Sequence, residues 1–308
     1  MKESFVHQIQ KRLTENSKLF LSDGIERLLN QDNGNEDYIN PDLLSLTCTS
    51  FQISIELALK SLALERAGLK SILNKKYENH SLDELEDLFK NNNIKTSEFE
   101  SVKNFVKSKG YITDLARGDF KVIEQFQIYR NRIVHFTYEF EEIDLYDMKY
   151  DLIYYLIQII FKILLSNQHQ DVKPSEFLAY SLKNGLHSQL THYPPYIEAM
   201  ERVSKENTDS VFKCIVCNNR TFSKFEEYCY CCNFITEDFK TIDCVHCKET
   251  KSVIYDNLNI ELNKNSARGL CLNCDTDGMI YQCPVCEFAY DNEIEFEKYC
   301  TEGNCVNN

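Results

Sequence analysis

The chain has 308 residues, and its 34 Lys and Arg against 48 Asp and Glu give a net charge of −14. A chain of this length predicts two domains. The negative charge excludes a protein that holds nucleic acid by a generally basic surface, so any RNA or DNA contact requires a local basic pocket.

Residues 1 to about 205 have the apolar spacing of helices throughout. Phe5, Ile9 and Leu13 begin an apolar stripe that residues 19–29 continue. Residues 31–40 predict a loop, and Pro41 predicts the first turn of a long helix that Gly68 ends.

Two capping boxes predict where the next helices begin. Ser81 with Glu84 opens a helix that runs through residue 89, and Ser97 with Glu100 opens one that residue 110 ends. Further helices are expected over about 119–136, 144–166, 175–190 and 195–205. The first half is therefore expected to be mainly α, a domain of residues 1–205 that is large enough to fold alone.

The most apolar segment, residues 152–165, is shorter than the roughly 20 residues that a membrane-spanning helix needs. Gln158 and Lys162 interrupt it one turn apart. We therefore expect a buried helix and no membrane partner. Residues 1–11 are polar and do not resemble a secretory leader, which predicts a cytoplasmic protein.

The octapeptide Tyr129–Phe136, YRNRIVHF, brings Arg130, Asn131 and His135 together. At about 100° per residue, Asn131 and His135 share one helix face. We expect that face to lie nearly opposite an apolar stripe of Val122, Phe126, Tyr129 and Ile133, with Ile128 beside His135 and with Arg130 and Arg132 flanking it. A guanidinium can hold a phosphate and a histidine can move a proton. From the spacing alone, a solvated polar face is the more frequent explanation.

RNRIVH matches R-N-x-x-x-H and resembles the R-x4-6-H motif of the HEPN superfamily of helical ribonucleases. Two upstream stretches extend the resemblance: the helix IELALKSLALERAG at residues 55–68, and NHSLDELEDLF at residues 79–89, which is similar to that superfamily's H-x-L-x-x-L segment. The resemblance covers about residues 40–166.

The resemblance implies a helical bundle that forms a homodimer with two motif helices facing a shared cleft. It implies metal-independent cleavage of RNA, in which the 2′-hydroxyl attacks the adjacent phosphate. Arg130 then binds phosphate, His135 transfers a proton and Asn131 assists. The H-x-Y extension of toxin members is absent, because residue 137 is Thr and the tyrosine is Tyr138.

Three other residues have simpler structural explanations. His80 precedes a helix cap and is expected to pack there, not to be a second base. Glu56 is expected to pair with Lys60 at i,i+4, although it could instead orient Arg130. Cys48 is expected to be a small apolar core residue.

Thirteen of the 14 cysteines lie after residue 213, mostly as C-x2-C pairs. This spacing predicts three structural zinc sites of four cysteines each, in small β-rich zinc-ribbon modules at about 211–235, 241–277 and 280–308 within a second domain, residues 206–308. Read in chain order, the ligand sets are Cys214, Cys217, Cys229 and Cys232; Cys244, Cys247, Cys271 and Cys274; and Cys283, Cys286, Cys300 and Cys305.

Several alternatives stay open for these cysteines. Six pairs can be matched in 15 ways. Cys231 competes with Cys232, although only Cys232 keeps the C-x2-C spacing from Cys229, and His246 is expected to be a bystander. Iron could fill the site that contains YQCPVCEFAYD, which resembles a rubredoxin knuckle. Disulfides are disfavoured in a cytoplasmic chain.

From Lys205 onward, 10 Lys and Arg face 18 Asp and Glu, a net charge of −8. Such ribbons suit a protein partner or a trigger better than a phosphate backbone. We therefore hold two hypotheses: an endoribonuclease whose ribbons recognise a target or trigger, for example in phage (antiviral) defence or a stress response, and a non-catalytic dimeric sensor scaffold whose acidic ribbons bind a protein. A zinc-ribbon transcription regulator is a weaker third.

Overall fold

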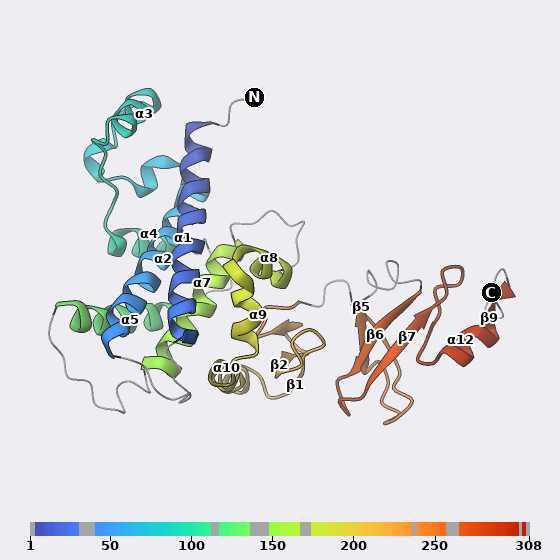
Figure 1. Cartoon of the computed structure of the whole chain (residues 1–308). Coiled ribbons are helices and arrows are strands. Elements are labelled where there is room, and N and C mark those ends of the chain that lie inside the picture. The colour runs from blue at the N-terminus through green and yellow to red at the C-terminus, as the bar shows by residue number, and fades with distance from the viewer. Residues whose placement is uncertain are drawn as a thin grey trace. The chain divides into compact units, whose positions relative to one another are not determined.

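The chain divides into two compact units, residues 1–199 and 200–308. The computed structural model describes residues 4–30, 41–111, 117–135, 148–166, 174–235, 239–256, 265–301 and 304–305 (Figure 1). The expected boundary at residue 205 lies near the end of a helix that contains the observed division, α10 (Pro194–Asn207). The loop expected at 31–40 lies outside the described residues.

In its described residues the first unit consists of helices joined by loops, as the apolar spacing predicts, with an isolated antiparallel bridge between Leu73 and Thr96. Its longer helices are α1 (Phe5–Asn30), α2 (Pro41–Ala67), α3 (Leu82–Lys90), α4 (Phe99–Lys109), α5 (Arg117–His135), α7 (Tyr154–Ser166), α8 (Pro174–Ser181), α9 (Leu186–Thr191) and the start of α10. Short turns of other helix types are η1 (Leu69–Ile72), η2 (Lys75–Tyr77), η3 (Met148–Ile153) and η4 (Lys183–Gly185).

Helices α1 and α2 pack closely because small residues line their contact. The buried hydroxyls of Ser17 and Ser54 each donate to the other residue's backbone carbonyl, at 2.8 and 2.9 Å. Gly24 lies under Phe51 so tightly that an added Cβ would stand 2.8 Å from the ring. Figure 1 shows the two helices side by side. α2 also packs against α4, α5 and α7, which makes it the central helix of the unit.

Two lysines hold α5 to its neighbours. Lys103 of α4 is 2% exposed, and its ammonium lies 2.9 Å from Glu100 and 3.2 Å from the side-chain oxygen of Gln127 on α5. Lys162 of α7 lies 3.7 Å from Asp119, a buried carboxylate in the first turn of α5. These contacts fix the helix that carries YRNRIVHF between α4 and α7.

The helix ends mostly follow the sequence signals, with two exceptions. The capping box of Ser81 and Glu84 is present, and Gly68 and Gly110 end their helices at positive φ. The expected box at Ser97 is wrong: α4 begins at Phe99, and the Ser97 hydroxyl donates instead to the Leu73 carbonyl at 2.6 Å. A tertiary hydrogen bond therefore replaces the local cap.

One expected continuous helix is interrupted, and another changes its helix type along its described part. The segment 175–190 breaks between α8 and α9, where Asn184 and Gly185 both take positive φ. In the segment 144–166, residues 148–153 form the π-helical turn η3 before the α-helical ladder starts at Tyr154. As expected, α7 is a buried helix: its Gln158 is buried and donates to the hydroxyl of Tyr196. Among the described helices, none combines the length and the apolar content needed to cross a membrane.

The second unit is built mainly from short strands. They are β1 (Val211–Lys213), β2 (Arg220–Ser223), β3 (Tyr228–Cys229), β4 (Phe239–Ile242), β5 (Val253–Asp256), β6 (Ser266–Cys271), β7 (Asp277–Gln282), β8 (Ala289–Tyr290), β9 (Cys300–Thr301) and β10 (Asn304–Cys305). β1, β2 and β3 form one antiparallel sheet, and β4 to β8 form a second in chain order.

The second sheet joins modules that the sequence suggested were separate. β7 leaves the cysteine pair at 271–274 and enters the pair at 283–286, and β8 then adds to its edge. The third module is less β-rich than expected, because helix α12 (Glu293–Tyr299) leads to the last cysteine pair. Its first turn is capped by the Asn292 side chain, which accepts from the Glu295 backbone at 2.7 Å.

Candidate metal centres and the motif helix

The structure brings the twelve selected cysteines together in the same three sets of four that chain order suggested. In each set the four sulfur atoms lie within 4.8 Å of one another. The cysteines are free thiols in this structure. Each group is able to hold a metal ion.

The sulfur spacing fits a tetrahedral metal. In the first group Cys214 lies 3.7 Å from Cys232 and Cys217 lies 3.8 Å from Cys229, and the two such distances in the second group are 3.8 and 3.7 Å. A regular tetrahedron with these edges has a centre-to-sulfur distance of about 2.3 Å, the usual Zn–S bond length. The third group is less regular, with sulfur pairs at 3.2 and 3.6 Å, so it must open slightly to take the same ion.

All five C-x2-C pairs fold into the same tight turn. In each, the first cysteine's N–H donates to the carbonyl five residues later, and its own carbonyl accepts from the N–H four residues later. The residue after the second cysteine has a positive φ of 56 to 63° in every case; these residues are Asn218, Asn233, Lys248, Asp275 and Glu287. This turn points both thiols of a pair to one side, which explains why the spacing predicts the sites so well. The C-x4-C pair instead spans the β9–β10 hairpin.

Backbone N–H groups also point at the sulfurs. The amides of Val216, Asn273 and Val285 each lie 3.4 Å from the sulfur of the cysteine two residues earlier. Such donors stabilise a thiolate over a thiol. They favour the deprotonated form that binds metal.

The thiols of one group have divergent pKa values. Hydrogen bonds from the Asn273 side chain and the Glu249 backbone lower the pKa of Cys247 to about 6, whereas burial raises that of its neighbour Cys244 to about 11. In the third group, the hydrogen bond with Cys283, followed by burial, raises the pKa of Cys305 to about 12. Adjacent sulfurs share protons because several negative charges cannot lie side by side, and a bound dication would remove that conflict.

The neighbours that competed for ligand positions are excluded from these groups. Cys231 is buried next to the first group, and its sulfur accepts from the Asn219 side chain at 3.3 Å. The exposed His246 belongs to none of the three groups. The spacing that favoured Cys232 over Cys231 and the expectation that His246 is a bystander both agree with this geometry.

The sequence did not predict the contact between the first and second cysteine groups. Arg268 of β6 donates to the Ile215 carbonyl at 3.0 Å and to the Asn218 side chain at 2.7 Å, both inside the first cysteine turn. Arg268 also pairs with Asp277, as does Lys213, and Arg220 pairs with Asp275. No sequence signal linked these distant residues. Three of the few cationic side chains in this unit are therefore engaged in ion pairs.

Helix α5 places YRNRIVHF at its C-terminal end, but its buried face differs from the expected stripe. Phe120, Ile123 and Phe126 are buried, whereas Val122, Tyr129 and Ile133 are only half-buried. The core-facing side is therefore rotated by roughly one residue, about 100°, toward the buried Ile123. Helix α5 packs against α2 and α7. Only Phe126 of the expected stripe is in the core.

This rotation changes the surroundings of the three motif residues. Arg130 is half-buried on the core-facing side, Asn131 is exposed, and Ile128 is 49% exposed. His135 is the last residue of α5, one turn beyond Asn131, and its side chain lies outside the described part. Arg130 donates to the Asn131 side chain at 3.0 Å. The expectation that Arg130 flanks an exposed face is therefore only partly correct.

Arg130 lies near Cys48 on α2. Burial raises the pKa of the Cys48 thiol to about 12, and the positive charge of Arg130 opposes that rise. The Arg130 Nε is buried and has no hydrogen-bond partner among the described residues. Cys48 itself is fully buried, as expected for a core residue. Arg132 lies over the Tyr129 ring, 5.8 Å from its centroid.

Glu56 and His80 make the structural contacts that the sequence predicted for them. Glu56 lies 2.6 Å from Lys60, which also donates to Thr96, so Glu56 serves an α2 ion pair. His80 packs edge-on against Tyr77 at 5.5 Å between ring centroids, just before the Ser81 cap.

Comparison of the chain with family models, with curated proteins and with solved structures finds no match.

Proposed function

We propose that the helical unit is a metal-independent endoribonuclease of the HEPN type, which acts at a cleft between two copies. The observation that carries the proposal is the side-chain pairing of Arg130 and Asn131 at 3.0 Å, one turn before His135 on the same helix. A guanidinium held by an amide is oriented to bind a phosphate, and a histidine one turn away can accept the 2′-hydroxyl proton.

The dimer in this proposal is supported by Ile128. It is an apolar side chain, half-exposed, at a helix position adjacent to the motif face. A second copy packed there would bury it and bring a second motif helix to the same cleft. Each copy would then supply an arginine that stabilises the charge developing on the phosphate.

We further propose that all three four-cysteine groups hold zinc and that their role is structural. Four protein ligands leave no open position for a catalytic water. Since Lys213, Arg220 and Arg268 are engaged in ion pairs, the acidic metal-binding unit offers phosphate little attraction. Recognition of a target or trigger by this unit therefore suits a protein better than RNA.

A second candidate function is a non-catalytic dimeric scaffold. The partial burial of Arg130, with its Nε enclosed, favours this candidate because a catalytic arginine must reach a phosphate. The scaffold would use the same dimer face, and its acidic ribbons would bind the partner.

The test is cleavage of a labelled RNA without added metal. EDTA is added only briefly, and the zinc content of the same sample is measured to show that the structural sites stay filled. We expect products with 2′,3′-cyclic ends from the wild type, and at least a hundredfold lower rate from His135→Ala and Arg130→Ala.

His80→Ala is the matched control, because this histidine lies outside the motif and should leave the rate unchanged. Cleavage that requires added Mg²⁺, or that survives His135→Ala, would refute the nuclease. A dimer without cleavage under any of these conditions would support the scaffold.

A further inference from the structure

One hollow lined by described residues lies in the metal-binding unit. It has a volume of about 700 Å³ and is formed by the edge strands β4 and β8, by Tyr255 of β5 and by helix α12. Sites of roughly 300–1,000 Å³ take small ligands or a few side chains. The edge strands are four positions apart in the sheet, yet Ile242 of β4 and Ala289 of β8 pack on the same buried cluster. The sheet is therefore curled, and the hollow lies on its concave face.

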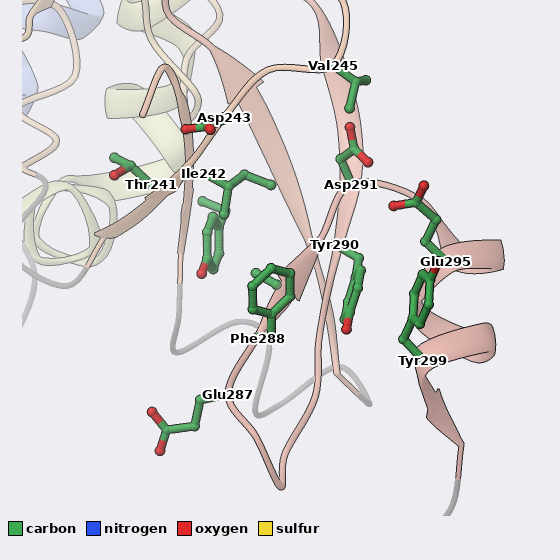
Figure 2. A pocket seen from close by; sticks show the side chains of 12 residues that line it. Thr241, Ile242, Asp243, Val245, Glu287, Phe288, Tyr290, Asp291, Glu295 and Tyr299 are labelled. Atoms are coloured by element: carbon green, nitrogen blue, oxygen red, sulfur yellow. The ribbon is translucent and has the colours of Figure 1, made fainter. Parts of the chain in front are cut away.

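Aromatic rings form much of the wall. Phe288 is 52% exposed, and its ring lies 4.9 Å from that of Tyr290, which in turn is stacked 6.3 Å from Tyr299. Figure 2 shows the Phe288 and Tyr290 rings standing between Ile242 on one side and α12 on the other. Ring faces attract cations and tolerate different aliphatic stems.

The polar part of the lining has one sign of charge. Four carboxylates line the hollow, and none of its described lining residues is Lys, Arg or His; the four are Asp243, Glu287, Asp291 and Glu295. Lys298, the nearest cation on α12, lies over the Tyr299 ring at 4.8 Å and is not part of the lining. A cation that enters would meet aromatic faces inside and carboxylates around it.

One carboxylate oxygen of Asp291 lacks a hydrogen-bond donor among the described residues. Its Oδ1 accepts from the neighbouring Asn292 side chain at 3.1 Å, but its Oδ2 is buried and has no hydrogen-bond partner among the described residues. A buried carboxylate oxygen without a donor is costly unless a ligand supplies one. A guanidinium or an ammonium group is a donor of the right charge.

We propose that this hollow binds an arginine- or lysine-rich segment of a partner protein. One cationic side chain of that segment enters the hollow, with the Phe288 and Tyr290 rings on one side of it and the Asp291 and Glu295 carboxylates on the other. This proposal is independent of the nuclease, because it concerns only the metal-binding unit. It gives the acidic charge of that unit a specific use and identifies the partner by its chemistry: a basic peptide.

The experiment measures binding of a fluorescein-labelled peptide of alternating Arg and Gly to the full-length, zinc-loaded protein by fluorescence anisotropy. Phe288→Ala removes an exposed ring without changing charge, and roughly a fivefold weaker binding is expected from the lost cation–π contact. Glu295→Gln is expected to weaken binding at least as much, and Glu297→Gln is its matched control. Glu297 is exposed on the same helix and does not line the hollow, so its substitution should change binding less than twofold.

Asp291→Asn distinguishes a binding role from a structural one. It should weaken peptide binding and at the same time raise the melting temperature of the free protein, because the negative charge on an enclosed oxygen without a donor is removed. Zinc content is measured for every variant to show that the fold is kept.

Three outcomes would overturn the proposal. The first is an equal loss of peptide affinity in Glu295→Gln and Glu297→Gln with no loss in Phe288→Ala. That result would show that the peptide is held by general charge attraction alone. The second is tighter binding of a labelled single-stranded RNA than of the peptide with the same dependence on Phe288. The third is no measurable peptide binding by the wild type at low ionic strength.

Discussion

Two neighbouring cysteines provide a sharp test of the first metal site. Cys231 and Cys232 are both buried, and their substitution by serine changes the same atom. Only Cys232 belongs to the four-sulfur group, where its sulfur lies 3.7 Å from that of Cys214. Cys231→Ser should therefore keep the metal, and Cys232→Ser should lose it.

The magnitude follows from what each sulfur contacts. A structural zinc site contributes on the order of 10 kcal/mol of apparent folding free energy, so loss of one of four thiolates should cost several kcal/mol of unfolding free energy. In Cys231→Ser the Asn219 side chain keeps an acceptor, because the serine hydroxyl replaces the sulfur at the end of a 3.3 Å hydrogen bond. That variant should lose about 1 kcal/mol or less.

The assay is metal content per chain together with thermal unfolding. We expect three zinc ions in the wild type and in Cys231→Ser, and two in Cys232→Ser, with a clearly lower melting temperature for the last. If Cys231→Ser lost the ion while Cys232→Ser kept it, the assignment of this group would be wrong. A visible absorption band in the purified protein would show iron at one of the sites.

Three further predictions follow from burial and packing. A chelator should remove metal from the second and third groups before the first, because all four cysteines of the first group are buried, and timed zinc release checks this order. Gly269→Ala should cost about 1–3 kcal/mol of unfolding free energy, because the new Cβ would lie 2.5 Å from the Ile280 side chain. Its cross-strand neighbour Gly278 has open space around the position of a new Cβ. Gly278→Ala is therefore a matched control that should change the unfolding free energy by less than about 0.5 kcal/mol. Ile128→Glu should dissociate the proposed dimer in light-scattering measurements, whereas Leu82→Glu, at a somewhat more exposed apolar site, should not. A monomeric wild type would contradict the proposed cleft.

The sequence by itself determined the features that depend on local geometry. C-x2-C turns, helix-ending glycines and the capping box at Ser81 are specified within about five residues, so their spacing predicted the three metal groups and most helix ends. The helical character of the first unit was predicted for the same reason, because apolar periodicity is a local property.

Only the tertiary structure decided which faces meet. The buried side of α5 is set by α2 and α7, whose contacts rotate it away from the stripe that apolar residues alone suggested, and Ser97 gives its hydroxyl to Leu73 instead of a helix cap. Arg268 reaches a cysteine turn some fifty residues earlier, and β4 and β8 enclose the aromatic hollow only because the sheet curls. Contacts of this kind depend on how separate elements pack, and no local pattern in the chain encodes them.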